Sequence, residues 1–330
     1  MMKRIAIALT VAALGAGVAV RAQEKRSDTL LTTEHYLDWE RVSDAQISPD
    51  GARIVYTRQH VNKMDDRWES ELWIINIDGS QHRFLTKGSA ARWSPDGKRL
   101  LYQAEGEPRG SQLFVRWIDA DGPATQVTRV SETPRSAKWS PDGRMVAFTG
   151  FAPTGHTHTV SDLWVMPLAS NGSGDMRKIS GDFDRDPINL KWAADGSGVY
   201  FDADDRGARN VAFAALVGGV KALTSGRQML SFDSISKNGI AAGISADLKH
   251  PQDVVKVDLK QPGQIVKLTD VNADVLQGIQ LGATEEITYT SSGSAKVMAW
   301  VTKPPSFDAS KKYPLILEIH GGPFGNYNVA

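Results

Sequence analysis

The sequence has no cysteine among its 330 residues. Disulfide frameworks, thiol catalysis, thiolate-ligated zinc and iron–sulfur clusters are therefore excluded. It has no net charge either, because 38 basic residues balance 38 acidic ones. A neutral chain gives no electrostatic reason to expect a nucleic acid or an anionic membrane surface as partner. The composition is otherwise that of a globular protein, with 41% hydrophobic and 23% charged residues.

The N-terminus has the pattern of a secretory signal peptide. Lys3 and Arg4 precede an uncharged run of 16 residues, which is too short to span a membrane. Val20 and Ala22 are small residues where a signal peptidase reads, so we expect cleavage after Ala22. The alternative is an uncleaved membrane anchor. Without residues 1–22 the chain keeps 35 basic and 38 acidic residues, a net charge of −3. We expect a secreted or periplasmic bacterial protein, free of the membrane after cleavage.

A five-residue motif recurs along the chain and is its strongest signal. Three copies read Ile or Trp followed by Ser-Pro-Asp-Gly, and two degenerate copies keep the final Gly. The copies start at residues 47, 93, 139, 192 and 235, at spacings of 46, 46, 53 and 43 residues. Pro presets the backbone of a type I turn, Ser bonds back to it, and Gly ends it. Each motif therefore predicts the first hairpin of a repeated unit.

The rest of each unit repeats as well. A short apolar strand follows each turn, then a second strand, a Gly-containing turn, and an outer strand that ends in Thr or Ser. With the strand that leads into the motif, this gives four strands per repeat of about 45 residues, the period of a β-propeller blade. We count five clear blades between Ile47 and Thr269 and a sixth within residues 279–300.

We therefore predict an all-β fold, a β-propeller of about six or seven four-stranded blades over residues 23–303. Residues 42–47 are expected to complete the last blade and close the ring; the alternative is an open sandwich of the same strands. Trp93, Trp139 and Trp192 fall at one point of each repeat. We expect them to pack between neighbouring blades and not to form a ligand cage.

After Trp300 the sequence changes character. The paired prolines Pro304 and Pro305 are typical of a linker. The nearly continuous apolar run from Leu315 to Ile319 predicts a buried strand of an α/β sheet. It ends in His320-Gly321-Gly322-Pro323, where a Gly-Gly turn lets backbone N–H groups approach a ligand oxygen with no Cβ in the way. In α/β-hydrolases the loop after the third strand supplies an oxyanion-hole donor in this manner.

Together these motifs resemble the prolyl oligopeptidase family of serine peptidases, and most of all its acylaminoacyl-peptidase and dipeptidyl-peptidase-like branch. The resemblance covers nearly the whole mature chain. It implies a propeller that caps a C-terminal α/β-hydrolase domain and admits peptide-sized substrates to a Ser-His-Asp triad. Gly321 and Gly322 match the oxyanion positions, with His320 and Pro323 as their neighbours in the motif. His320 is not the triad base, and we expect no metal and no cofactor.

The triad itself is absent from the sequence. No Gly-x-Ser-x-Gly is present, and the nearest stretch, residues 243–247, lacks the final Gly and is interpreted as a strand. We expect residues 304–330 to be a linker and the first strand of an incomplete α/β-hydrolase domain. The chain is then the inactive N-terminal part of a longer peptidase, whose remaining domain binds the peptide substrate. In isolation, residues from about 304 on are expected to be disordered or to adhere to another surface.

Two clusters suggest metal ions only weakly. His156 and His158 alternate as on one face of a strand, but no third ligand is visible, so a solvated loop is favoured. Residues 202–205 resemble the start of a calcium loop but lack the Gly and Glu at their offsets. Solvated turn carboxylates are the favoured interpretation there.

Three acidic residues suggest a contact with substrate. Asp65, Asp66 and Glu69 lie in an insertion between two strands of the first blade. Loops on one face of a propeller often meet a partner domain or a substrate. We hypothesise that these acids attract the N-terminus of a peptide.

Two functions compete. The first is the substrate-gating propeller of a secreted serine peptidase that hydrolyses short peptides. The second is a non-catalytic, TolB-like periplasmic propeller that binds a protein partner on one face. Residues 313–325 favour the first, because a pure binding propeller has no use for a buried strand that ends in His-Gly-Gly-Pro.

Overall fold

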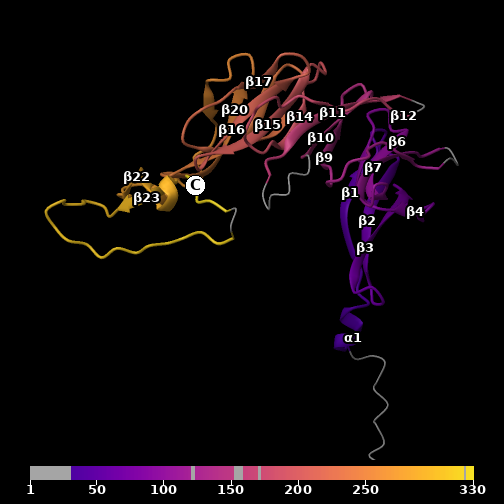
Figure 1. Cartoon of the computed structure of the whole chain (residues 1–330), viewed down its shortest axis with the longest axis horizontal. Coiled ribbons are helices and arrows are strands. Elements are labelled where there is room, and N and C mark those ends of the chain that lie inside the picture. Colours follow the sequence, from indigo (N-terminus) through magenta and orange to yellow (C-terminus); the bar gives the residue numbers. More distant parts are fainter. Residues whose placement is uncertain (1–30, 120–122, 152–158, 170–171, 323–324) are drawn as a thin grey trace, which may run out of the picture.

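The computed structural model describes residues 31–119, 123–151, 159–169, 172–322 and 325–330. The predicted signal peptide lies outside these residues. The fold is almost all β, with 51% strand and 4% helix. The sheets follow one another along an arc in chain order (Figure 1). The predicted all-β, propeller-like repeat is confirmed.

The first three sheets each contain four main antiparallel strands in chain order. The first sheet is β1 (Arg41–Ile47), β2 (Arg53–Asn62), β3 (Arg67–Asn76) and β4 (Arg83–Lys87). The second is β5 (Ser89–Trp93), β6 (Arg99–Gly106), β7 (Gly110–Trp117) and β8 (Thr125–Gln126). The third is β9 (Arg135–Trp139), β10 (Met145–Gly150), β11 (Asp162–Ala169) and β13 (Arg177–Lys178), with the short β12 (Gly172–Ser173) also on β11.

One eight-stranded sheet and a hairpin complete the described fold, and the two halves of that sheet are called the fourth and fifth sheets below. The fourth sheet is β14 (Ile188–Trp192), β15 (Gly198–Asp205), β16 (Ala208–Ala215) and β17 (Gly219–Ala222). The fifth is β18 (Met229–Ile235), β19 (Ile240–Asp247), β20 (His250–Asp258) and β21 (Ile265–Lys267). One parallel pair, Arg209 with Met229, joins the fourth and fifth sheets. The hairpin of β22 (Ala283–Thr290) and β23 (Lys296–Lys303) stands where the sixth blade was predicted.

Helices are short in the described part of the chain. They are α1 (Thr33–Tyr36), α2 (Ala273–Leu276) and the 3-10 turn η1 (Ser292–Ser294). None of the helices described is long and apolar enough to cross a membrane.

The prediction that residues 42–47 complete the last blade is wrong. They form β1, which pairs with β2 and aligns Ile47 with Ile54. β1 and the β22–β23 hairpin lie at opposite ends of the arc (Figure 1). The turn at Ser48–Gly51 folds β1 directly back onto β2, and strands that follow each other in sequence pair more readily than distant ones.

The repeated turns form as predicted. In the second sheet, Ser94 Oγ donates to Asp96 Oδ1 over 2.5 Å and accepts the N–H of Arg99 over 3.0 Å. The N–H of Gly97 donates to the carbonyl of Ser94 over 2.9 Å, with φ of +69° that favours glycine. The same bonds recur at Ser48, Ser140 and Ser236.

Tryptophan side chains link successive sheets, which confirms that prediction. Each indole N–H donates to a main-chain carbonyl of the first strand of the preceding sheet. The three bonds run from Trp93 to Gln46 (3.0 Å), from Trp139 to Arg92 (3.0 Å) and from Trp192 to Lys138 (3.1 Å). The acceptor always stands one residue before the equivalent motif position, so the repeat in sequence becomes a repeat of contacts.

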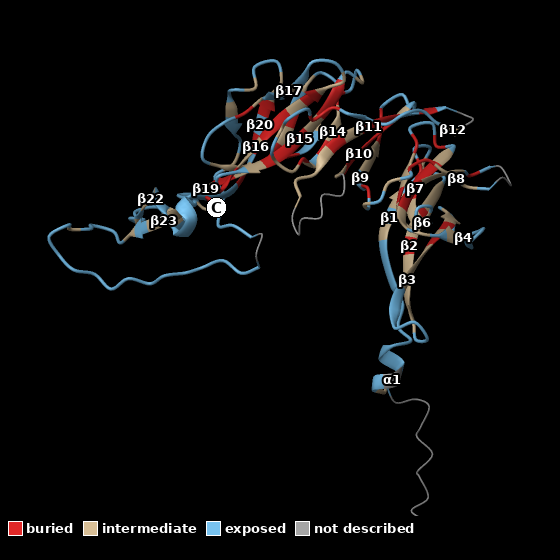
Figure 2. Cartoon of the chain, in the orientation of Figure 1, coloured by how far each residue is buried: buried red, intermediate tan, exposed pale blue. Residues whose placement is uncertain are grey.

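The hydrophobic core is divided into four clusters, each shared by two successive sheets. Figure 2 shows the buried residues concentrated within the sheets. Fully buried side chains from the two sides of each cluster are Leu72 with Leu100, Leu113 with Phe148, Leu163 with Phe201, and Val211 with Phe232. Each such side chain contributes about 1.5–3 kcal/mol by burial, so the sheets stabilise one another in pairs.

The predicted buried strand at residues 315–319 is not formed. Residues 304–322 and 325–330 contain no helix or strand, and Leu315, Ile316, Leu317 and Ile319 are 77–91% exposed. A run with two apolar faces needs cover on both, and no strand lies beside it among the described residues. The end of this segment contacts the fourth sheet near the β15–β16 turn. There Val329 is fully buried, and its N–H donates to the carbonyl of Gly207 over 2.9 Å.

Candidate functional site

The predicted acidic group lies on the β2–β3 hairpin, which projects beyond the rest of the first sheet (Figure 1). β2 and β3 pair along ten residues each, from Arg53 opposite Asn76 to Asn62 opposite Arg67. β4 pairs only with residues 71–74 of β3. The far part of the hairpin is therefore a narrow ribbon, held by its own ladder and by side-chain contacts.

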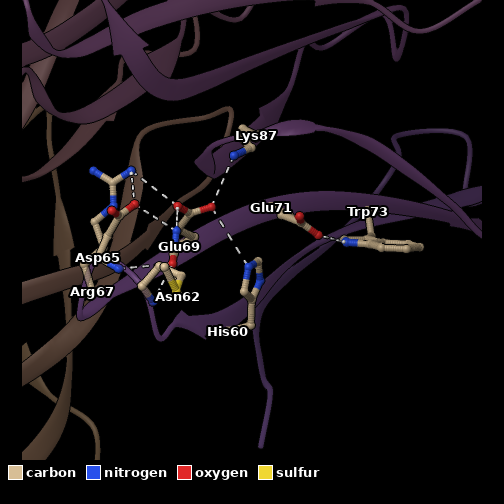
Figure 3. A network of polar contacts seen from close by, with 9 residues as sticks. His60, Asn62, Asp65, Arg67, Glu69, Glu71, Trp73 and Lys87 are labelled. Atoms are coloured by element: carbon tan, nitrogen blue, oxygen red, sulfur yellow. Dashed lines mark hydrogen bonds and ion pairs between the residues drawn. The ribbon is translucent and has the colours of Figure 1, made fainter. Parts of the chain in front are cut away.

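Glu69 is the centre of those contacts (Figure 3). Asn62 Nδ2 donates to Glu69 Oε1 over 2.8 Å, and Arg67 Nη2 lies 3.3 Å from the same oxygen. Lys87 Nζ lies 3.2 Å and His60 Nε2 4.0 Å from Oε2. Hydrogen bonds from Asn62 and Lys87 lower the pKa of Glu69 to about 2. The carboxylate is thus ionised at neutral pH and held by donors of the chain itself.

Asp65 joins this cluster and Asp66 does not. Asp65 Oδ2 accepts a bond from Asn62 Nδ2 over 3.0 Å and lies 3.6 Å from Arg67 Nη2. Asp66 stands at the hairpin tip with φ of +47°, and it makes no ion pair with any described residue. Because cations accompany Asp65 and Glu69, only Asp66 offers an uncompensated charge. The hypothesis of a peptide N-terminus here stays a prediction.

The predicted oxyanion glycines lie in an exposed loop. A Cβ added to Gly321 or Gly322 would meet no atom within 4 Å, and Gly322 has φ of +68°. The ring of His320 packs edge-on against Tyr327, with 6.0 Å between ring centres. Pro323 lies outside the described residues. An oxyanion hole needs N–H donors that the surrounding structure holds in place. No described residue packs against Gly321 or Gly322 closely enough to hold this loop.

The structure does not bring the two predicted groups together. The hairpin tip and the glycine loop lie in different parts of the molecule (Figure 1). His156 and His158 are outside the described residues. In the part of the chain that the structure describes, no three His, Cys, Asp or Glu side chains gather as a metal ion requires.

The interpretation of residues 202–205 as solvated turn carboxylates is wrong for Asp202, whereas Asp205 is exposed beside the turn that follows it. These residues end strand β15, and Asp202 is only 2% exposed. Asp202 Oδ2 accepts bonds from Ser231 Oγ over 2.5 Å and Asn189 Nδ2 over 2.8 Å. Burial raises the pKa of Asp202, and these two bonds offset only part of that effect. The side chain belongs to the contact between the fourth and fifth sheets.

One polar cavity escaped the sequence analysis. It has a volume of about 410 Å³ and lies between the second and third sheets, with Arg92, Arg135 and Lys138 in its lining. The sequence does carry a signal for it, because a basic residue precedes the motif tryptophan in three successive repeats, as Arg92, Lys138 and Lys191.

No family model matches the chain. Dipeptidyl-peptidase 5 of Porphyromonas gingivalis is 25% identical over 239 residues, which are 70% of this chain and 34% of the relative. An uncharacterised peptidase of Bacillus subtilis, YuxL, is 25% identical over 237 residues, 69% of this chain and 33% of the relative. The chain is therefore similar to peptidases of the prolyl oligopeptidase type over their propeller region. It spans about a third of the length of these curated relatives.

Two solved structures share this fold. A dipeptidyl aminopeptidase IV-like protein of Bacteroides ovatus matches with a TM-score of 0.60 and 16% identity, over 86% of this chain and 47% of that one. A puromycin hydrolase matches with a TM-score of 0.56 and 16% identity, over 81% and 43%. At this identity the matches establish the fold alone.

Proposed function

We propose that the chain is the substrate-gating propeller of a secreted serine peptidase of the prolyl oligopeptidase family. The observation that carries this proposal is the alignment with peptidases across 70% of the chain. Four-stranded sheets repeat along the chain, and the His-Gly-Gly motif follows them in sequence. Residues that this sequence lacks then cleave the peptide, and the propeller selects what reaches them.

The chain alone is expected to be inactive. It has no Gly-x-Ser-x-Gly elbow, and its two oxyanion candidates, Gly321 and Gly322, are exposed to solvent. An oxyanion donor without nucleophile and base gives little catalysis even in a formed site. The function proposed for this chain is therefore steric and electrostatic selection.

Export is part of the same proposal. The basic start, the apolar run and the small residues before Gln23 support removal of residues 1–22. N-terminal sequencing of the native protein from a periplasmic or culture fraction should begin at Gln23. A native protein that begins at Met1 or Met2 would refute export by a cleaved signal.

The peptidase proposal is tested on the native protein. Antibodies against the 330-residue chain would capture it from its source, and release of aminomethylcoumarin would be followed with free and acetylated dipeptidyl substrates. We expect hydrolysis that a fluorophosphonate abolishes, and none by the 330-residue chain alone. Captured protein that cleaves no peptide and does not react with the fluorophosphonate would refute a peptidase and favour a binding propeller.

A further inference from the structure

The first strands of the sheets form a continuous row. β1 adjoins β5, β5 adjoins β9, and β9 adjoins β14. In a propeller the strands nearest the axis line the central channel. Each of these strands has a register shift against its neighbour in the sheet. The shifts coincide with left-handed residues three positions before the motif start, Asp44, Ala90, Ser136 and Asn189, with φ between +52° and +56°.

These bulges accompany a row of cations. A bulge re-aims the side chains that follow it, and the residues two positions further on are Gln46, Arg92, Lys138 and Lys191. Burial lowers the pKa of Lys138, the positive charges of Arg92 and Lys191 lower it further, and the carboxylate of Asp44 opposes them in part. Burial also lowers the pKa of Lys191. Like charges from three successive sheets therefore face one another along the row.

The cavity between the second and third sheets opens on this row. Its lining includes Arg92, Arg135 and Lys138 and contains no carboxylate. Arg92 Nη1 is paired with Asp44 Oδ2 over 2.6 Å. The exposed Arg135 and the partly buried Lys138 make no ion pair in the described part of the chain. Hydroxyl groups of Thr133 and Ser136 complete the polar wall, so this side of the cavity holds two cations that no described carboxylate pairs with directly.

A partly buried cation without a counter-ion is unfavourable, and an anion in the cavity relieves both its desolvation and the mutual repulsion. A carboxylate suits the wall because a guanidinium binds it through two parallel N–H donors and an ammonium adds a third. The volume of about 410 Å³ lies within the range of small-ligand sites. We propose that Arg92, Arg135 and Lys138 form a binding site for a peptide carboxylate on the channel side of the propeller.

That the carboxylate belongs to a peptide rests on the proposed function, whereas the anion site rests on the geometry. Calorimetry on the purified 330-residue chain would compare acetyl-Glu-Glu-amide with the isosteric acetyl-Gln-Gln-amide. We expect the Glu peptide to bind about tenfold more tightly, the worth of one charge-assisted hydrogen bond. Its affinity should fall as salt screens the cations. Equal affinity for the two peptides, or no binding of either, overturns the proposal.

Two variants locate the site. Lys138→Gln should weaken binding of the Glu peptide by about tenfold without lowering the urea midpoint, since it removes a partly buried unpaired charge. Lys256→Gln, on the exposed side of β20, is the matched control and should bind as the wild type does. Undiminished binding by Lys138→Gln refutes the site. If the chain binds the acidic peptide but the native protein has no peptidase activity, the site stands and the proposed function is refuted. If the native protein is a peptidase but the chain does not bind the acidic peptide, the proposed function stands and the site is refuted.

Discussion

Trp139 connects the second and third sheets in two ways. Its ring packs in a buried cluster with Leu113 and Phe148, and its N–H donates to the carbonyl of Arg92 over 3.0 Å. A buried donor without a partner costs about 1–3 kcal/mol, so the bond fixes the orientation in which the ring packs. Contacts of this kind make the motif tryptophans structural.

Trp139→Phe is expected to lower the free energy of unfolding by about 1–3 kcal/mol, through the lost bond and the smaller ring. Urea unfolding measures it. Trp117→Phe is the control, because Trp117 is 41% exposed and its indole makes no hydrogen bond to a described residue; we expect a change within about 0.5 kcal/mol. Equal losses in the two variants would show that the inter-sheet bond is unimportant.

Asp202 is a residue whose charge opposes folding. Its folded-state pKa is raised by burial above an unfolded value of about 3.9. The folded state then holds the proton more tightly, so the contribution of Asp202 to stability is greatest at low pH and falls as the pH rises. Asp202→Asn removes this dependence. Relative to the wild type, the variant should gain stability as the pH rises above about 4. A difference in unfolding free energy that does not change with pH would contradict this role of Asp202.

At the scale of elements, the β2–β3 hairpin shows how a ribbon without a third strand is held. The cluster around Glu69 joins both strands to Lys87 of β4. These contacts fix the direction of the hairpin and place Asp66 at its tip.

Glu69→Gln should weaken the hairpin in a pH-dependent manner. The folded pKa of about 2 is below the unfolded value of about 4.3, so the stabilisation is present above the unfolded pKa and is lost as the pH falls through the folded one. The difference in unfolding free energy between wild type and variant should be full at neutral pH, fall below the unfolded pKa and disappear only below about pH 2. Lys87→Met should reproduce part of the loss. A difference that persists at acid pH would show that charge is not the cause.

The segment from Pro304 onward is an element without a partner. Lys311 and Lys312 are exposed and lie outside any strand or helix, so limited trypsin digestion should cut there first. Mass spectrometry of the early products should show residues 31–303 intact. Early cleavage within β5–β21, with residues 304–330 uncut, would refute the assignment of the stable fold to the sheets.

At the scale of the whole molecule, the features that the sequence predicts correctly are local ones. The turn at Ser94–Gly97 and the strand that follows it are set by neighbouring residues, so a five-residue motif suffices to predict them. The position of β1 was not predicted because the strand could pair with the first sheet or with the last one. Which of them it joins depends on strand pairing, which the local sequence does not determine. The convergence of Arg92, Lys138 and Lys191 was missed because it depends on bulges in strands 46 and 53 residues apart.

The predicted strand at Leu315–Ile319 shows that a local apolar pattern does not by itself determine whether a strand forms. Its apolar residues predict burial in a sheet, but burial requires neighbouring strands, and the described residues contain none beside it. The oxyanion role of Gly321 and Gly322 stays a prediction for the same reason.

The central claim is that this chain gates a peptidase, and the intact mass of the native protein tests it most directly. Protein captured from its source would be treated with a fluorophosphonate and weighed by mass spectrometry. The account predicts a product heavier than the 330-residue chain that gains one label on serine. A mature product of residues 23–330 that takes up no label would contradict it and leave a propeller that only binds.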